Sequence, residues 1–221
     1  MMKVSKRKET YLFLKRIIDF VLSLVGCVVL TPFFLILCIS IKVDSKGPIL
    51  FRQKRIGLHK KYFYILKFRT MKIDTPKDTP THMLENPEQY ITKVGKFLRK
   101  TSLDELPQIF NILKGDMSII GPRPALWNQY DLIEERDRYG ANDVMPGLTG
   151  WAQINGRDEL EIPFKAKLDG EYVEKMSFGF DLKCFIGTIF SVLRHDGVVE
   201  GGTGMIGKQG EKNEKNTDNW C

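Results

Sequence analysis

SLDELPQIFNILKGDMSIIGPRP, residues 102–124, places two neighbouring acids, Asp104 and Glu105, just before Pro107. Proline is tolerated only among the first positions of a helix, whose N–H groups have no intrahelical partner. The helix is therefore predicted to begin between residues 103 and 105, and the lysine that precedes Gly115 predicts its end there. The residues that follow, MSIIGPRP, predict a strand that ends in a rigid turn.

The paired acids have two interpretations. At a helix start, ionised carboxylates are stabilised by the helix dipole, typically by about 0.3–1 kcal/mol, and the unpaired N–H groups can hold a phosphate. The sequence Ser102-x-x-Glu105 also matches a capping box, and Asp104 is itself a good N-cap residue. These four residues alone favour capping, so the choice depends on the charges that surround them.

The chain has 221 residues, enough for one domain with a sizeable core. Its 34 Lys+Arg residues against 27 Asp+Glu give a net charge of +7, which favours an anionic partner such as nucleic acid, phospholipid headgroups or a phosphorylated substrate. The cysteines show no paired short spacing of the zinc or redox kind, which predicts reduced thiols and no metal cluster. They are Cys27, Cys38, Cys184 and Cys221.

Residues 17–41 form an apolar run with one charge, Asp19, and as a helix they would extend about 38 Å, enough to cross a hydrocarbon core of about 30 Å. Pro32 predicts a kink in the middle of this run, where the hydroxyl of Thr31 can bond a freed carbonyl. Basic residues flank both ends, whereas a spanning helix carries its Lys/Arg excess on one side. They are Lys3, Lys6, Arg7, Lys8, Lys15 and Arg16 before the run, and Lys42 and Lys46 after it. We therefore expect a re-entrant helix that enters one leaflet and returns, with a straight span as the alternative.

The remaining residues predict a small, mostly helical domain of the α+β class with short strands. Residues 47–57 and 61–71 are rich in β-branched and aromatic side chains and predict a hairpin. Residues 72–90 predict a surface loop, and 126–140 a charged surface helix. Residues 146–157, PGLTGWAQINGR, predict a glycine-rich loop of the kind that lets backbone approach a ligand.

A final helix is predicted from Asp181 onward, because apolar residues there follow the spacing i, i+3, i+4, i+7. They are Leu182, Phe185, Ile186, Ile189, Phe190 and Leu193. Such a face either packs on a core or lies on a membrane as an amphipathic interfacial helix. Beyond Gly201 no periodicity remains, so the predicted organisation is a basic N-terminus and membrane helix over 1–46, a folded domain over 47–200 and a disordered tail over 201–221.

Cations surround the paired acids in the sequence. Arg99 lies just before them, and Arg123 lies just after them in the stiff PRP turn. Lys67, Arg69 and Arg157 add further cations beside strand or glycine segments. The rigid fork of arginine suits phosphate, and a carboxylate that approaches a phosphate needs cations to overcome mutual repulsion. Taken singly, each of these cations is better explained as a solvated surface charge.

Three segments resemble the signature sequences of the bacterial sugar transferase family, monotopic phosphoglycosyl transferases that begin capsule, O-antigen or glycoprotein glycan assembly. They are KFRTM at 67–71, RKTSLDELPQIFNILKGDMSIIGPRP at 99–124 and PGLTGWAQINGR at 146–157, and the resemblance runs from Tyr11 to Val199. It implies transfer of a phosphosugar from a UDP-sugar to polyprenyl phosphate, such as undecaprenyl phosphate, with release of UMP. It also implies a re-entrant helix broken at Thr31-Pro32, and a catalytic domain at the cytoplasmic face of the bacterial inner membrane.

By the same resemblance, Asp104 is the nucleophile and Glu105 the ligand of Mg²⁺, the implied cofactor. An aspartate can attack the β-phosphorus and leave an acyl-phosphate intermediate, and Mg²⁺ would neutralise charge on the leaving group. The predicted substrate-binding residues are Lys67, Arg69, Arg99, Arg123, Gln153, Arg157 and Asp169. Of these, Gln153 and Arg157 are expected to contact the nucleotide or the sugar. Asp169 would support the metal or orient a cation, or would be an ordinary surface acid before a glycine.

Two other functions compete with this prediction. A basic membrane-tethered scaffold for polysaccharide assembly would use the charge and the amphipathic helix, but it gives the Asp-Glu-Pro arrangement no role. Nucleic-acid binding fits the pI, but the sequence matches no recognition module. The predicted partners are therefore the UDP-sugar, polyprenyl phosphate and membrane lipids, without nucleic acid. Homo-oligomers and assemblies with later glycan enzymes stay open, as does the identity of the sugar.

Overall fold

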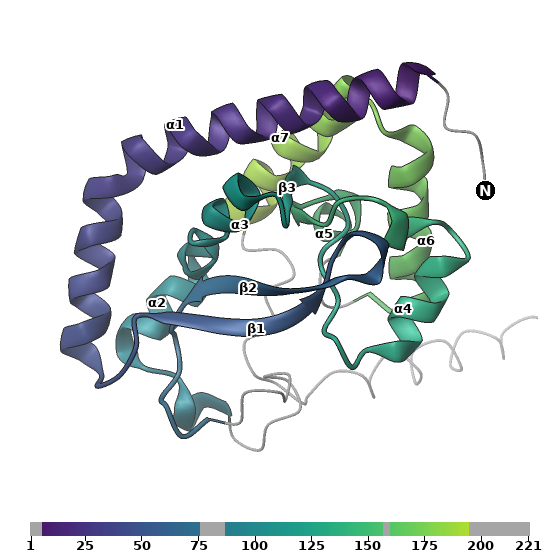
Figure 1. Cartoon of the computed structure of the whole chain (residues 1–221). Coiled ribbons are helices and arrows are strands. Elements are labelled where there is room, and N and C mark those ends of the chain that lie inside the picture. The colour runs from purple at the N-terminus through teal and green to yellow at the C-terminus, as the bar shows by residue number, and fades with distance from the viewer. Residues whose placement is uncertain (1–5, 76–86, 157–159, 195–221) are drawn as a thin grey trace, which may run out of the picture.

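The computed structural model describes residues 6–75, 87–156 and 160–194 (Figure 1). The tail predicted over 201–221, most of the loop predicted over 72–90, and Arg157 lie outside these residues. The helices are α1 (Lys6–Asp44), α2 (Lys93–Lys100), α3 (Gln108–Lys114), α4 (Tyr130–Asp137), α5 (Trp151–Ile154), α6 (Ile162–Lys175) and α7 (Phe178–Arg194). The strands are β1 (Leu50–Ile56), β2 (Tyr62–Phe68), β3 (Ser118–Ile120) and β4 (Gly147–Thr149). The predicted class, mostly helical with short strands, is confirmed.

Helix α1 is one continuous helix of 39 residues that contains Pro32 and changes direction part-way along its length (Figure 1). Proline removes one backbone hydrogen bond and clashes with the preceding turn, which accounts for the bend. The hydroxyl of Thr31 bonds the Cys27 carbonyl at 2.7 Å. The carbonyl that loses its donor to Pro32 is that of Val28, so the predicted hydroxyl bond exists but is made one residue earlier.

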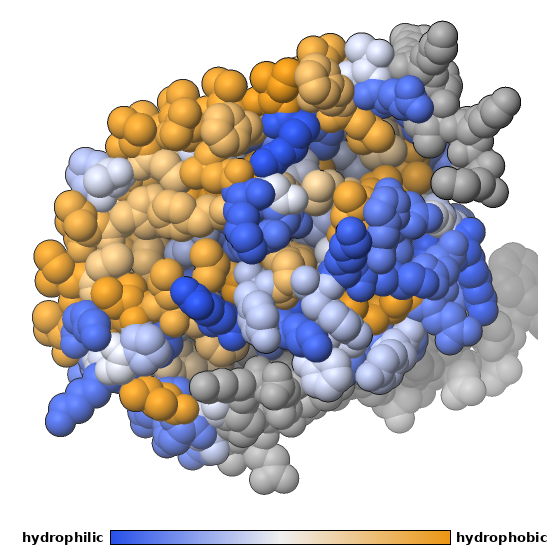
Figure 2. Space-filling view, in the orientation of Figure 1, coloured by the Kyte–Doolittle hydropathy of each residue, from blue (hydrophilic) through white to orange (hydrophobic). Residues whose placement is uncertain are grey.

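Within the described residues, α1 is the helix whose length and composition are sufficient to cross a membrane. Most of its apolar side chains face outward, and hydrophobic surface covers much of both limbs of the bend (Figure 2). Val28 and Val29 before the bend are 70% and 69% exposed, and Leu35 and Ile36 after it are 61% and 60% exposed. An apolar surface of this extent indicates membrane association.

Both limbs of α1 are joined to the same folded domain. On the first limb, the carboxylate of Asp19 accepts hydrogen bonds from the Ser118 hydroxyl and the Ile119 N–H, and Lys15 pairs with Asp181 of α7 at 2.9 Å. On the second limb, Leu37 and Ile41 join a buried cluster with Phe68 and Leu98. The bend therefore closes over the domain instead of leading away from it (Figure 1).

The predicted hairpin is confirmed, with β1 and β2 antiparallel and Leu50 opposite Phe68. After β2, Arg69 turns to the end of α1, where its guanidinium donates to the carbonyls of Ser45 and Lys46. Helix α2 packs so closely on this segment that a Cβ at Gly95 would lie 2.0 Å from the Thr70 carbonyl oxygen. These contacts hold the hairpin against the second limb of α1.

The helix predicted in the opening stretch begins in two steps. A 3₁₀ turn, Leu103–Glu105, leads through Pro107 into α3, which ends at Gly115 with φ of 96°. The predicted end is confirmed, because glycine readily adopts this left-handed conformation. The capping box is wrong, since Ser102 has φ of 56° and its side chain makes no capping bond.

Within the predicted glycine-rich loop, residues 147–149 form β4 and residues 151–154 form α5, so the prediction of a loop is wrong for these residues. Strand β4 pairs in parallel with β3, with Ile120 opposite Thr149. A Cβ at Gly147 would lie 2.1 Å from the Gly121 nitrogen, and one at Gly150 would lie 2.1 Å from the Gly121 carbonyl oxygen. These glycines therefore let two backbones approach each other, and they hold the PRP turn in place.

The apolar face of α7 is exposed, which rules out core packing for its central residues. Leu182 is 58% exposed, Phe185 48%, Ile189 47% and Phe190 56%. Helix α6, between 162 and 175, was not predicted, because its apolar and polar residues alternate without a clean helical stripe. Together with α4 it forms the side of the domain away from the bend of α1 (Figure 1).

Candidate active site

The paired acids, called here the acid dyad, lie in the 3₁₀ turn that contacts β2 and α2. Leu103 and Leu106, on either side of the dyad, pack into the cluster that contains Leu37 of α1 and Phe68 of β2. Apolar anchoring of the flanking residues fixes the turn and leaves the two acids to face the polar side chains of β2. The dyad thus lies next to the second limb of the membrane-associated helix.

Glu105 is held by two cations. Its Oε1 accepts from Lys67 Nζ at 2.7 Å and from Arg123 Nη2 at 2.6 Å, and its Oε2 accepts from Arg123 Nη1 at 3.2 Å. The arginine contact is bidentate, which fixes orientation as well as charge. The hairpin, the dyad turn and the PRP turn are therefore joined at one carboxylate.

Asp104 is less constrained than its neighbour. Within the described part of the chain its carboxylate accepts no hydrogen bond, and its closest cation is Lys67, with Nζ 4.0 Å from Oδ2. Its side chain is 14% exposed, similar to the 18% of Glu105. One acid is thus fixed while the other retains oxygens available for reaction.

The two carboxyl groups have opposite pKa shifts. Burial raises the pKa of Asp104 most strongly, and the negative charge of Glu105 adds to this, against lowering by Lys67, Arg99 and Arg123. Burial also raises the pKa of Glu105, but the charges and hydrogen bonds of Arg123 and Lys67 outweigh it and hold this pKa well below its usual range. At neutral pH Glu105 is therefore the firmly ionised member of the dyad.

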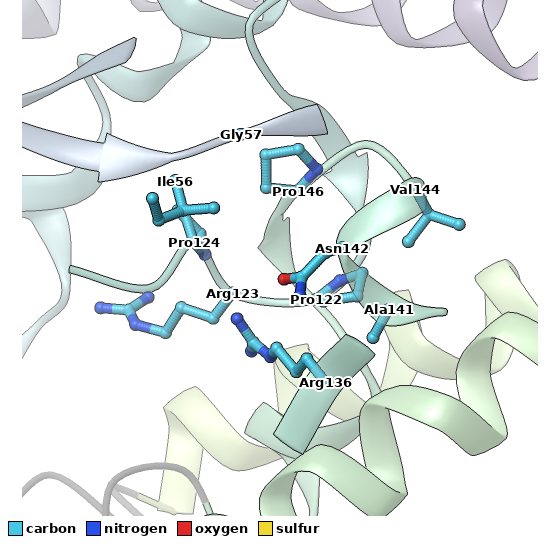
Figure 3. A pocket seen from close by; sticks show the side chains of 10 residues that line it. All are labelled: Ile56, Gly57, Pro122, Arg123, Pro124, Arg136, Ala141, Asn142, Val144 and Pro146. Atoms are coloured by element: carbon cyan, nitrogen blue, oxygen red, sulfur yellow. The ribbon is translucent and has the colours of Figure 1, made fainter. Parts of the chain in front are cut away.

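A small polar hollow adjoins Arg123. It is lined by the PRP turn, the end of β1 and the segment 141–146, and the guanidinium of Arg136 reaches toward the PRP turn (Figure 3). Its volume is about 10 Å³, which is room for one water molecule. It is too small to bind a nucleotide.

Comparison with known proteins identifies the family of this chain. Residues 10–195 match the family described as bacterial sugar transferase. The chain belongs to the bacterial sugar transferase family.

Relatives of this sugar transferase differ in length. It is 41% identical to the Bacillus subtilis (strain 168) protein named "Uncharacterized sugar transferase EpsL" over 85% of this chain and 91% of that protein. It is 41% identical to the UDP-glucose:undecaprenyl-phosphate glucose-1-phosphate transferase of Escherichia coli (strain K12) over 80% of this chain. It is 34% identical to the undecaprenyl-phosphate galactose phosphotransferase of Salmonella typhimurium over 86% of this chain. The chain covers 39% and 42% of the length of these last two proteins.

The structure of the sugar transferase brings together part of the predicted substrate-binding set. Lys67 and Arg123 bind the dyad directly, and the charge of Arg99 acts on Asp104. Arg69 is not among these cations, because its guanidinium is buried against Ser45 and Lys46 at the end of α1. Its observed contacts are those of a structural residue.

Asp169 and Gln153 are both buried away from the dyad. Asp169 is 1% exposed and accepts from Arg136 Nε at 2.8 Å, so the surface-acid alternative is wrong and the acid orients a cation. Burial raises the pKa of Asp169 and the Arg136 guanidinium opposes this shift. Gln153 donates to the Leu148 carbonyl at 3.3 Å and thereby ties α5 to β4.

Two residues near the dyad escaped sequence reasoning. Asn111 bridges β2, with its amide bonded to the N–H of Leu66 and the carbonyl of Tyr64. Gln108 is 1% exposed, and among the described residues neither its Nε2 nor its Oε1 has a partner. Gln108 and Asn111 follow Asp104 by four and seven residues, a spacing that predicts one shared helix face for all three side chains.

The dyad offers few ligands to a metal ion. Within the described residues no three His, Cys, Asp or Glu side chains converge. Mg²⁺ is commonly held by one or two carboxylates together with substrate phosphates. Glu105 Oε2 accepts one hydrogen bond and keeps a lone pair, so the donor set fits Mg²⁺ shared with a diphosphate. With Lys67, Arg99 and Arg123 already opposing two carboxylates, a metal without the diphosphate would meet net positive charge.

Proposed function

We propose that this protein is a phosphoglycosyl transferase that moves a phosphosugar from a UDP-sugar to polyprenyl phosphate. The observation that carries the proposal is the acid dyad itself, in which cations fix Glu105 while Asp104 accepts no hydrogen bond from any residue that the structure describes. A membrane-tethered scaffold has no use for two carboxylates that are largely withdrawn from water beside three cations, because desolvating such charges is costly. The names of the relatives support the same class of reaction.

The first step is attack by an Asp104 carboxylate oxygen on the phosphorus that carries the sugar. The new bond joins this oxygen to phosphorus, and the bond from the same phosphorus to the bridging diphosphate oxygen breaks, so that UMP leaves with the electron pair. Lys67, Arg99 and Arg123 oppose the repulsion between carboxylate and diphosphate. An aspartyl phosphosugar remains on the enzyme.

In the second step a phosphate oxygen of the acceptor attacks the same phosphorus. The acyl-phosphate bond breaks, the Asp104 carboxylate is regenerated, and the product is a polyprenyl diphosphate sugar. Mg²⁺ bound at Glu105 would supply a positive charge that stabilises the departing UMP. Because Glu105 is already fixed by Lys67 and Arg123, it needs little reorganisation when the donor binds.

The bent helix supports a re-entrant position in the membrane. A straight span would place its two ends on opposite sides, yet Lys15 on the first limb and Asp44 on the second both bind the same domain. We infer that the bend dips into one leaflet and that the domain lies at the cytoplasmic face. The acceptor phosphate would then reach the dyad from the adjacent headgroup layer.

The proposal is tested with donor alone. Purified enzyme incubated with UDP-sugars and Mg²⁺ should release UMP up to one equivalent, and intact-mass measurement should show the phosphosugar on the peptide that contains Asp104. Asp104→Asn should abolish both signals, whereas Glu105→Gln should keep a slow signal with altered metal dependence. Brisk turnover without any adduct on wild-type enzyme would reject the covalent intermediate.

A further inference from the structure

A second hollow, much larger than the one beside Arg123, lies inside the bend of α1. It has a volume of about 810 Å³. Its walls come from both limbs of α1, the start of β1, the end of β2 and the start of α3, and we call it the α1–α3 groove. Its lining residues are Cys27, Thr31, Phe34, Leu35, Cys38, Pro48, Ile49, Leu50, Phe51, Arg52, Phe68, Pro107 and Phe110.

The groove is apolar and accessible. Four phenylalanines line it, and the ring of Phe34 lies 5.7 Å from that of Phe68 and 5.8 Å from that of Phe110. Phe110 is 45% exposed and Leu35 is 61% exposed, so the groove opens to the surface on the side of the bend. Its volume falls within the range of sites that bind small molecules, about 300–1,000 Å³.

The groove lies close to the acid dyad, although neither acid is among its lining residues. Phe68 directly follows Lys67, and Pro107 lies two residues after Glu105. Leu103 and Leu106, which flank the dyad, pack on the same buried cluster as Phe68. A molecule in the groove would therefore have one end next to the cations of the dyad and its apolar part under the bend of α1.

We propose that the α1–α3 groove binds the isoprenoid chain of the acceptor, with the first units nearest the phosphate against the phenylalanines. The inference rests on the proposed function and specifies where its acceptor lies. Within a bilayer, lipid tails are as apolar as leucine, so burial of apolar area alone does not select one lipid. Selection must come from van der Waals packing, and a rigid aromatic wall can fit a branched, unsaturated chain differently from a straight acyl chain.

Two native thiols report on occupancy without any reaction. Cys27 and Cys38 line the groove from opposite limbs and are partly exposed, whereas Cys184 is fully buried. The measurement uses enzyme that carries Cys221→Ser and undecaprenyl phosphate in micelles. At nine-tenths occupancy of the groove only one tenth of the molecules leave these thiols accessible, so the alkylation rate of Cys27 and Cys38 should fall by about tenfold. Val29→Cys, on the outward surface of α1, is the matched control and should keep its alkylation rate.

A phosphatidic acid, which carries a similar phosphate on straight acyl chains, tests selectivity in the same assay. It should protect the groove thiols much less than undecaprenyl phosphate at equal concentration. Equal protection by both lipids, or equal slowing at the Val29→Cys control, would overturn the assignment, as would no protection at all. Peptide mapping separates the rates at the two native thiols.

A variant that fills the groove tests its role in turnover. Leu35→Trp should raise the KM for undecaprenyl phosphate by about tenfold or more, because a pocket filled with extra atoms loses contacts with its ligand. The matched variant Val29→Trp, outside the groove, should leave this KM unchanged. An unchanged acceptor KM in Leu35→Trp would contradict the groove, provided that donor-only UMP release shows the variant to be folded.

The two proposals fail in different ways. If wild-type enzyme never releases UMP from any donor, the proposed reaction is wrong, while thiol protection by undecaprenyl phosphate still decides whether the groove binds it. If UMP release and the aspartyl adduct are observed but neither lipid protects Cys27 and Cys38, the reaction stands and the groove assignment is wrong.

Discussion

Asp104 and Glu105 are neighbours in the chain but have different environments. Glu105 accepts three hydrogen bonds from two cations, and Asp104 accepts none from the described residues. The raised pKa of Asp104, caused first by burial, makes its carboxylate a stronger base and nucleophile once it is ionised. The same shift means that more of it is protonated in mildly acidic solution.

We expect the rate of donor-only UMP release at saturating donor to fall as the pH drops through a pKa above the ordinary aspartate value of about 4. The sign follows because the reactive form is ionised and burial favours the protonated form. Among the charges that lower the pKa of Asp104, that of Lys67 has the largest effect. Lys67→Met should therefore shift the acid limb of the pH profile, the range in which the rate falls with decreasing pH, to higher pH. Lys60→Met, which removes a surface partner of Asp137, should not move it. Identical acid limbs in wild type and Lys67→Met would contradict the assignment.

At Gln108, a substitution should change the stability of the protein and its activity in different directions. Its buried amide has no partner among the described residues, and an unsatisfied polar group costs about 1–3 kcal/mol. Gln108→Leu should therefore keep or raise the melting temperature. We expect the unpaired amide of Gln108 to contact the bound donor, so the same variant should lower donor-only UMP release. A destabilised variant with normal UMP release per folded molecule would instead indicate a structural amide that bonds to water.

At the scale of elements, the parallel β3–β4 pair holds Arg123 in place. Gly147→Ala would put a Cβ 2.1 Å from the Gly121 nitrogen, an atom of the backbone that cannot move aside. We expect it to lower the free energy of unfolding by about 3 kcal/mol and the melting temperature by roughly 6–12 °C. In Gly179→Ala, a Cβ would meet nothing within 4 Å, so this matched variant should be neutral or slightly stabilising. Equal melting temperatures for the two variants would refute the close packing.

The bend of α1 predicts that both ends of this helix lie on the same side of the membrane. Val43 is 83% exposed and lies at the end of the second limb, so a cysteine there reports which side of the membrane that limb reaches. In cells expressing Val43→Cys without other cysteines, an impermeant maleimide should react only after permeabilisation. Adding Pro32→Leu should allow part of the population to span and to react in intact cells. Full labelling of Val43→Cys itself in intact cells would establish a straight span.

At the scale of the whole molecule, α7 and α1 present apolar surface together. Figure 1 shows α7 beneath the first limb of α1, and Lys15 and Tyr11 both bond to Asp181 of α7, with Tyr11 at 2.7 Å. The exposed side of α7 therefore has a fixed orientation relative to the membrane-associated helix. This arrangement supports the interfacial alternative for α7.

A spin label tests that orientation. In lipid nanodiscs, a nitroxide at Ile186 on the exposed apolar side of α7 should be more accessible to oxygen than to a water-soluble nickel complex. A label at Glu174, an exposed position on α6, should show the opposite preference. Water-like accessibility at Ile186 would place α7 in solvent and exclude it from the membrane interface.

The sequence by itself determined the α+β class, the hairpin, the end of α3, the kinked apolar helix and the family. Each of these depends on local chemistry: β-branched runs, a glycine beyond a basic turn, a proline within apolar residues, and long contiguous motifs. Only the tertiary structure decided the roles of single side chains. It placed Arg69 against the end of α1, paired Asp169 with Arg136 and bound Glu105 to Lys67 and Arg123 in place of a capping bond. The physical reason is that charge pairing, burial and backbone approach are set by residues distant in the chain, and neither spacing nor propensity records which distant segments meet.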